Sequence, residues 1–176
     1  MSNLSISFKF ENMDKSLTPS LSVRQAQPDE ILKILRVQID ALRVLCVKDY
    51  SLDQIEALVD RNISHFSRGG YRGETTFVAE LENVVVGASS LLGHRISAVY
   101  IHPLYNRQGI GSQLLDAVEH LACSRNIRTL RVTASLTAFP FYKAKGYQIV
   151  DESHLVTKDG LRIRCIEMMK QVLSAY

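Results

Sequence analysis

The alternation of hydrophobic and polar positions predicts a series of strands and helices that starts near residue 21. Residues 21–26 alternate apolar and polar side chains, as a half-buried strand does. Apolar residues then recur at helical spacing at Ile31, Leu35, Ile39 and Leu42. A second helix is expected to begin at Ser51, which forms a capping-box pattern with Gln54, and to end near Gly69 and Gly70.

The rest of the chain alternates between strand and helix patterns. Strands are expected at residues 75–81, 84–92, 96–101, 129–133, 147–150 and 162–168, with a two-residue hairpin turn at Glu82 and Asn83. Helices are expected from about residue 109 to 124 and from 139 to 145. The order β-α-α-β-β-β-α-β-α-β-β predicts an α/β fold, with a mixed central sheet of about six to seven strands and helices on both faces.

Composition supports a single globular domain over residues 21–176, preceded by a polar segment, residues 1–20, that we expect to be a flexible leader. Apolar residues make up 46% of the 176 residues and charged residues 22%, which is ordinary for a soluble protein. The chain shows no apolar run long enough to span a bilayer and no secretory signal pattern. We therefore expect a cytoplasmic protein without a membrane partner.

Charge and cysteine content exclude two further classes. The net charge of +3 is too small, and its basic residues too dispersed, for a nucleic-acid partner, although it suits an anionic ligand. The three cysteines, Cys46, Cys123 and Cys165, form no CxxC pair, so neither a metal site nor a disulfide framework is expected.

The segment from Val99 to Ser112 carries the clearest chemical signal. A strand ends near a proline, and Gly109 and Gly111 then open an amphipathic helix. The free backbone N–H groups and positive dipole at such a helix start bind phosphate or pyrophosphate, and Arg107 adds a positive charge. A tight turn without a ligand is the alternative. The dinucleotide fingerprint is excluded, because Leu114 stands where its third glycine would be.

These residues resemble the GCN5-related N-acetyltransferases over roughly residues 21–169. The family signature Gln/Arg-x-x-Gly-x-Gly/Ala is matched by Asn106-Arg-Gln-Gly109-Ile-Gly111, with Asn in place of Gln or Arg. A second family pattern, Asn-x-x-Ala-x-x-x-Tyr followed by Gly-Phe/Tyr, is matched from Ser135 to Tyr142 and at Gly146, with Ser in place of Asn. Within the family, the chain is similar to a poorly characterised bacterial branch.

The resemblance implies an acyl-CoA N-acyltransferase fold and an enzyme that moves an acetyl group from acetyl-CoA, its co-substrate, to a primary amine by direct attack. It assigns cofactor binding to the strand edge and to the loop at the helix start. The residues are Val99, Tyr100, Ile101, Arg107, Gln108, Gly109, Ile110, Gly111, Ser112 and Ser135. Tyr142 corresponds to the family tyrosine that serves as general acid for the leaving thiolate.

The acceptor side is less defined. By resemblance, the pocket is built largely from the first two helices and their loop, and Cys46, Asp49, Tyr50 and His94 are the candidate substrate-binding residues. Many relatives carry a glutamate base early in the strand before the signature, but here that position reads Arg95. The candidate bases are therefore His94, His102, Glu74 and Glu80, or a bound water, and none is assigned.

The acceptor itself is left open between a small-molecule amine and a protein amine, and a homodimer is in keeping with relatives. Two other functions compete with catalysis. The replaced Asn106 and Ser135 and the missing glutamate suit a CoA-binding sensor or regulator with reduced catalysis, whereas Tyr142 argues against it. An unrelated phosphate-binding module with a coincidental glycine pair is the third reading.

Overall fold

The computed structural model describes residues 20–67 and 73–172. They form one seven-stranded sheet in the order β1-β2-β3-β4-β5-β7-β6. The strands are β1 (Leu21–Gln25), β2 (Thr75–Leu81), β3 (Val84–Leu92), β4 (Arg95–Ile101), β5 (Thr129–Ser135), β6 (Gln148–Val156) and β7 (Arg162–Gln171). The helices are η1 (Pro28–Glu30), α1 (Ile31–Leu45), α2 (Leu52–Ser67), η2 (Pro103–Tyr105), α3 (Ile110–Ser124) and α4 (Phe139–Ala144).

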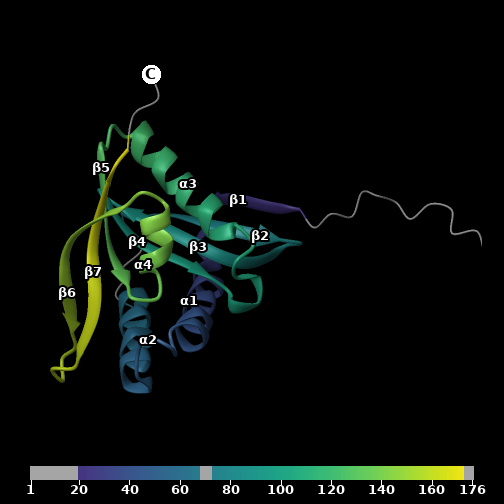
Figure 1. The fold of residues 1–176 in the computed structure, drawn as a ribbon. Helices are drawn as coiled ribbons and strands as arrows, with labels where there is room; N and C mark the ends of the chain where they lie inside the picture. The colour runs from purple at the N-terminus through teal and green to yellow at the C-terminus, as the bar shows by residue number, and fades with distance from the viewer. Residues whose placement is uncertain (1–19, 68–72, 173–176) are drawn as a thin grey trace, which may run out of the picture.

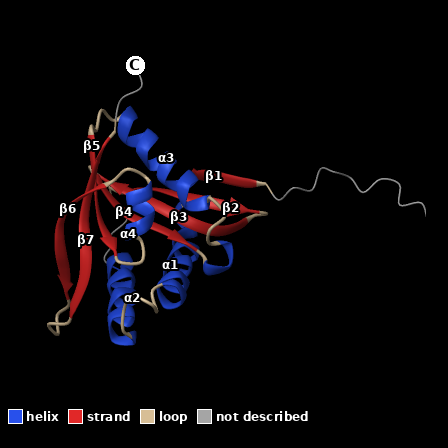
Figure 2. Ribbon diagram, in the orientation of Figure 1, coloured by secondary structure: helices blue, strands red, loops and turns tan. Residues whose placement is uncertain are grey.

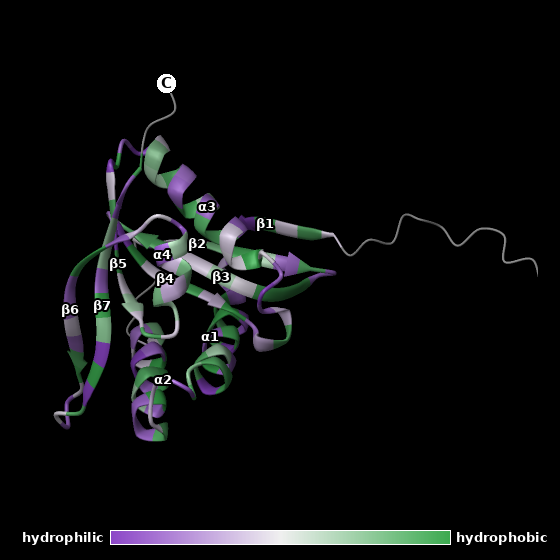
Figure 3. Cartoon of the chain, in the orientation of Figure 1, coloured by the Kyte–Doolittle hydropathy of each residue, from purple (hydrophilic) through white to green (hydrophobic). Residues whose placement is uncertain are grey.

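Helices cover both faces of the sheet (Figure 1, Figure 2). Ile34 and Val37 of α1 pack with Val78 and Ala88 on one face, whereas Leu114 of α3 packs with alternate residues of the same strands on the other. The helices carry hydrophilic as well as hydrophobic residues around their circumference (Figure 3), as helices with one buried face do. The predicted α/β fold, with a mixed sheet and helices on both faces, is confirmed.

The turn between β2 and β3 adopts the geometry that the sequence predicts. Glu82 and Asn83 have φ values of 49° and 66°, and two consecutive left-handed residues define the turn that suits the twist of a two-residue hairpin. The antiparallel ladder of β2 and β3 continues to β4, with an irregularity on each side of β3. On the β4 side, Ser97 is the extra residue of a bulge between the pairs Leu91–Ile96 and Ser90–Ala98.

Strands β4 and β5 are parallel and stay paired only at their beginnings. Arg95 pairs with Arg131 and Ile96 with Val132, and the two strands continue to Ile101 and Ser135 without further pairs. The edge of β4 beyond the bulge therefore faces β5 across a gap instead of a ladder. This gap positions the site described below.

The last part of the sheet is longer than predicted. Strand β6 runs to Val156 instead of Val150, and β7 to Gln171 instead of Met168. Strand β6 is an edge strand that pairs only with β7, and most of its side chains are exposed. An exposed edge strand needs no hydrophobic alternation, so the sequence gives little sign of where it ends.

Three predictions fall partly or wholly outside the described residues. The leader over residues 1–20 lies there apart from Ser20, as does the helix end at Gly69 and Gly70. The boundaries of the single domain therefore stay a prediction. Within the described residues, no helix is long and apolar enough to cross a bilayer.

Candidate active site

The opening between β4 and β5 leads into a cleft of about 1120 Å³. Its walls include Ser97, Val99, Tyr100 and Ile101 of β4 and Thr133, Ala134 and Ser135 of β5, together with residues of the α1–α2 connection, α2, the start of α3, α4 and β7. The backbone groups of β4 that face this gap are not engaged by β5. An unpaired strand edge of this kind accepts an extended, amide-bearing ligand as an added strand.

The loop that opens α3 closes one end of the cleft. Arg107 and Gly109 have φ values of 64° and 81°, so the backbone turns sharply in the left-handed region, at Gly109 without a side chain in the way. The hydrogen bonds of the helix begin with the amides of Ser112 and Gln113, which donate to the Gly109 carbonyl oxygen at 3.1 and 3.2 Å. The amides of Ile110 and Gly111 precede these bonds and stand at the positive end of the helix, which favours an anion.

Nine of the ten predicted cofactor residues line the cleft, namely Val99, Tyr100, Ile101, Arg107, Gly109, Ile110, Gly111, Ser112 and Ser135. Gln108 is not among the lining residues, and its side-chain amide donates to the Leu104 carbonyl oxygen at 3.4 Å. The Ser135 hydroxyl accepts a hydrogen bond from the Ala138 amide at 3.1 Å, so it stabilises the turn before α4. The amide of Arg107 is likewise engaged, because it donates to the Asn106 side-chain oxygen at 2.9 Å.

Tyr142 enters the cleft wall from α4. The residue is 3% exposed, and its ring makes edge contacts with Phe141 and Tyr147 at centroid distances of 5.2 and 5.4 Å. Burial, with a smaller contribution from Tyr100, raises the pKa of Tyr142 above its ordinary value. The phenol therefore stays protonated at neutral pH, in the state that can donate a proton.

The α1–α2 connection contributes Cys46, Asp49 and Tyr50 to the cleft, as predicted. The Tyr50 hydroxyl donates to the Arg164 carbonyl oxygen at 2.7 Å and accepts from the Leu136 amide at 2.8 Å. Burial raises the pKa of Tyr50 to about 12, which keeps it a donor. The Asp49 carboxylate accepts from the Thr137 hydroxyl at 2.6 Å. Both side chains thus connect the α1–α2 connection to the β5–α4 turn.

His94 does not join the other predicted acceptor residues. It is exposed in the turn between β3 and β4 and is not among the residues that line the cleft. The sequence does not show whether a histidine in a turn faces the site, because the pairing of the two strands sets the direction of the turn.

Helix α2 supplies lining residues that the sequence analysis did not select: Leu58, Arg61, Asn62 and His65. Their spacing of three, one and three positions puts them on one helical face, and this spacing was a usable signal. The sequence does not mark this face as part of a site, because it adjoins the buried apolar positions Ile55 and Val59, which indicate core packing. The described residues hold no cluster of three or more His, Cys, Asp or Glu side chains able to bind a metal.

Comparison with known families identifies this arrangement. The sequence profile of the acetyltransferase (GNAT) domain matches residues 46–172. The chain belongs to the GCN5-related N-acetyltransferase family. The predictions of the family and of an N-acetyltransferase are thereby confirmed, and an unrelated phosphate-binding module is excluded.

Individual relatives agree with this family. The chain is 26% identical, over 77% of its length and 87% of the relative, to the uncharacterized N-acetyltransferase YafP of Escherichia coli. A GCN5-related N-acetyltransferase from Rhodopseudomonas palustris has a similar structure, with a TM-score of 0.77 and 30% identity over 88% of this chain and 96% of that one.

Two more distant structures share the fold and were solved with a CoA species. The PaiA N-acetyltransferase of Thermoplasma acidophilum, in complex with coenzyme A, has a TM-score of 0.63 at 16% identity and covers 86% of this chain and 99% of its own. YncA of Salmonella typhimurium, with acetyl-CoA, has a TM-score of 0.59 at 18% identity and covers 88% of this chain and 95% of its own.

Proposed function

We propose that this N-acetyltransferase moves the acetyl group of acetyl-CoA to a primary amine by direct attack, with Tyr142 as general acid. The observation that carries the proposal is the unpaired edge of β4, which opens beside the first amides of α3. The strand edge suits the amide-rich pantetheine arm, and the helix start suits the pyrophosphate. The relatives solved with CoA or acetyl-CoA support the same ligand.

The chemistry follows from the groups that line the cleft. A neutral amine attacks the thioester carbonyl, the C–N bond forms, and the C–S bond breaks. Backbone N–H groups near Val99 to Ile101 stabilise the charge that develops on the carbonyl oxygen. Tyr142 donates its phenolic proton to the leaving sulfur. Because a thiol has a reference pKa of about 8.5, the thiolate is a tolerable leaving group and this proton assists without being indispensable.

The acceptor is a small-molecule or protein amine that enters past the α1–α2 connection, where Cys46, Asp49 and Tyr50 line the cleft. A cytoplasmic location and a homodimer stay predictions of the sequence. Residues 173–176, at the end of the chain, lie outside the described residues.

A CoA-binding sensor with reduced catalysis is the second candidate. It is favoured by Arg95, which stands at the family's glutamate position and forms an ion pair with Glu167 at 3.0 Å. It is favoured also by Ser135, whose hydroxyl is engaged in its own turn. A sensor would bind CoA without turning over any amine.

The test is a thermal shift with acetyl-CoA, CoA and ATP at matched concentrations, followed by CoA release in the presence of amines. A ligand at 100 times its dissociation constant adds about 2.7 kcal/mol to the stability, which raises Tm by roughly 5 to 10 °C for a domain of this size. We expect this shift with both CoA species, little shift with ATP, and turnover with at least one amine. No shift with any CoA species contradicts the proposal, and a shift without turnover supports the sensor.

A further inference from the structure

A buried carboxylate lies beside a histidine on the wall of the cleft. The Glu74 side chain is 2% exposed, and its Oε1 lies 3.0 Å from Nε2 of His65, whose side chain is 46% exposed. Glu74 directly precedes β2, and His65 is in the last turn of α2. Both residues line the cleft. The pair thus joins bulk solvent, through the imidazole, to a carboxylate that is otherwise shielded.

The pair borders the bulge of β4. A small polar cavity of about 40 Å³ connects Glu74 and His65 with Ser97, Ser90 and Tyr100. Ser97 is the bulge residue at which β4 leaves β5. The carboxylate is therefore close to the bulge at which β4 leaves β5, beside the last turn of α2. A polar cavity of this size accommodates a water molecule.

The reaction requires that the acceptor amine lose a proton before it attacks. An alkyl amine has a reference pKa of about 10.4 and is mostly protonated at neutral pH, and an ammonium ion has no lone pair with which to attack a thioester. A carboxylate within reach of the ammonium, directly or through one water, removes the proton.

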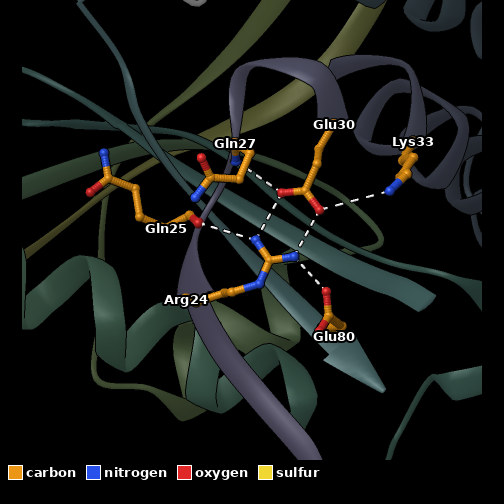
Figure 4. Close-up of polar contacts among 6 residues, drawn as sticks. All are labelled: Arg24, Gln25, Gln27, Glu30, Lys33 and Glu80. Carbon is orange, nitrogen blue, oxygen red and sulfur yellow. Dashed lines mark hydrogen bonds and ion pairs between the residues drawn. The ribbon is translucent and has the colours of Figure 1, made fainter. Parts of the chain in front are cut away.

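The other candidate bases are placed elsewhere. His94 and His102 are not among the residues that line the cleft, and His102 lies 3.7 Å from Asp40 of α1. Glu80 is paired with Arg24 at the far strand β1 (Figure 4). Of the four candidates from the sequence, Glu74 alone lines the cleft.

The surrounding charges are few. The titratable groups that share the small cavity with Glu74 are His65 from α2 and Tyr100 from β4. Arg61 and Arg95 are among the charged residues that line the larger cleft. Arg95 is neutralised by Glu167. From the opposite face, Arg125 reaches the Thr75 hydroxyl at 2.7 Å. No second carboxylate lines the small cavity among the described residues, and Asp49, which lines the larger cleft, accepts a hydrogen bond from Thr137.

We propose that Glu74 is the general base of the transfer and that His65 positions its carboxylate, in place of the glutamate that relatives carry on β4. This inference rests on the proposed acetyl transfer. In the step, the acceptor ammonium gives one proton to the Glu74 carboxylate and becomes a neutral amine. The amine lone pair then forms the C–N bond while the C–S bond electrons leave with sulfur, which takes the phenolic proton of Tyr142. The second proton, which the new amide nitrogen loses, passes through the cleft and restores the Tyr142 phenol. Glu74 returns its proton to water through His65 or the cleft.

The test compares kcat/KM of the wild type, Glu74→Gln, Glu74→Asp and Glu82→Gln across pH 6 to 10. The probes are acetyl-CoA and a panel of lysine, spermidine, glycine and a peptide with a free N-terminus. We expect Glu74→Gln to lose roughly 100-fold at pH 7, as removal of a general base does. The loss is expected to shrink about tenfold per pH unit below the pKa of each acceptor amine, as the free amine accumulates, and to level off above that pKa. Glu74→Asp keeps a carboxylate and is expected to lose less than Glu74→Gln.

Glu82→Gln removes a carboxylate from the exposed β2–β3 turn and is expected to behave as the wild type. The thermal shift with CoA, measured on every variant, is expected to be unchanged, because Glu74 serves the acceptor and not the cofactor. Two outcomes overturn the inference on Glu74 and leave the proposed acetyl transfer standing. Either Glu74→Gln is as active as an active wild type, or the loss of activity in Glu74→Gln is constant with pH. A wild type that binds CoA but acetylates no amine overturns the proposed function instead.

Discussion

Tyr142 illustrates how the surroundings of a single side chain decide its chemistry. A tyrosine on a short helix beside other aromatic residues could serve only the core. Here the ring packs against Phe141 and Tyr147, while the residue also lines the cleft. No described residue forms a hydrogen bond with its hydroxyl in the structure. Burial keeps the phenol protonated, so a core position and a proton-donating role are compatible.

Replacing Tyr142 by phenylalanine tests this role. We expect Tyr142→Phe to lower kcat by roughly 100-fold, the lower end of general acid–base effects, with the thermal shift by CoA retained. Stopped-time assays of CoA release measure kcat. Tyr147→Phe is the matched control, because it removes the hydroxyl that donates to Glu119 at 3.0 Å from the same aromatic cluster outside the cleft. Equal activity of the two variants would argue against a catalytic hydroxyl.

At the residue scale, the sequence predicted the type of chemistry better than the use of each side chain. The resemblance to the family predicts binding roles for Ser135, Asp49 and Tyr50, and all three line the cleft. Their polar atoms, however, are engaged with Ala138, Thr137, Arg164 and Leu136. Such long-range partners cannot be read from local spacing, because 86 to 114 residues separate Tyr50 from its two partners along the chain.

At the element scale, Tyr50 joins the α1–α2 connection to two other parts of the chain. Its hydroxyl bridges the Leu136 amide just after β5 and the Arg164 carbonyl of β7. This bridge lies beyond the last β4–β5 pair, Ile96 with Val132, so it joins the α1–α2 connection to the sheet without help from the β4–β5 ladder. The α1–α2 connection therefore stabilises the fold as well as lining the cleft.

We expect Tyr50→Phe to lower the free energy of unfolding by about 1–3 kcal/mol, because one amide and one carbonyl lose their partner. Urea denaturation followed by circular dichroism measures the change. Tyr105→Phe is a suitable control, since no hydrogen bond of its hydroxyl joins it to a described residue. If Tyr50→Phe is as stable as Tyr105→Phe, the hydrogen bonds of the Tyr50 hydroxyl contribute nothing to the free energy of unfolding.

Predicted elements were most accurate where helices cover both faces of the strands. Strands β2 and β3 match their predicted bounds because their buried residues run together between clear turn residues. The bulge at Ser97 and the separation of β4 from β5 were not predicted in position from the residues. Both features depend on which strands pair with each other, and the hydrophobic periodicity within one strand does not show its partner.

At the scale of the whole molecule, the first strand is joined to the helical layer by an ion-pair network (Figure 4). Glu30 is 4% exposed, and it accepts two hydrogen bonds of 2.8 Å from Arg24 and one of 2.9 Å from the Gln27 amide. Arg24 also contacts Glu80 of β2. The Arg24 hydrogen bonds lower the pKa of Glu30 from its usual 4.5 to about 2, against the opposing effect of burial.

This shift predicts how stability depends on pH. A carboxylate whose pKa is lower in the folded state stabilises fully above its unfolded value, and the contribution is lost as pH falls from about 4.5 to about 2. We expect Glu30→Gln to be about 1–3 kcal/mol less stable than the wild type at pH 7, from the loss of charged hydrogen bonds. The difference should narrow below pH 4.5, which chemical denaturation at several pH values measures. A gap that is constant down to pH 2.5 would contradict this linkage.

The sequence by itself determined the element order, the glycine-containing start of α3 and the family, because each depends on local periodicity or on short spacings such as Asn106-Arg-Gln-Gly109-Ile-Gly111. The tertiary structure decided which side chains meet. It brought His65 and Glu74 together at the cleft, left His94 and Gln108 outside it, and engaged Tyr50 in the framework. The physical reason is that strand pairing and helix docking set these distances, and both join segments far apart along the chain.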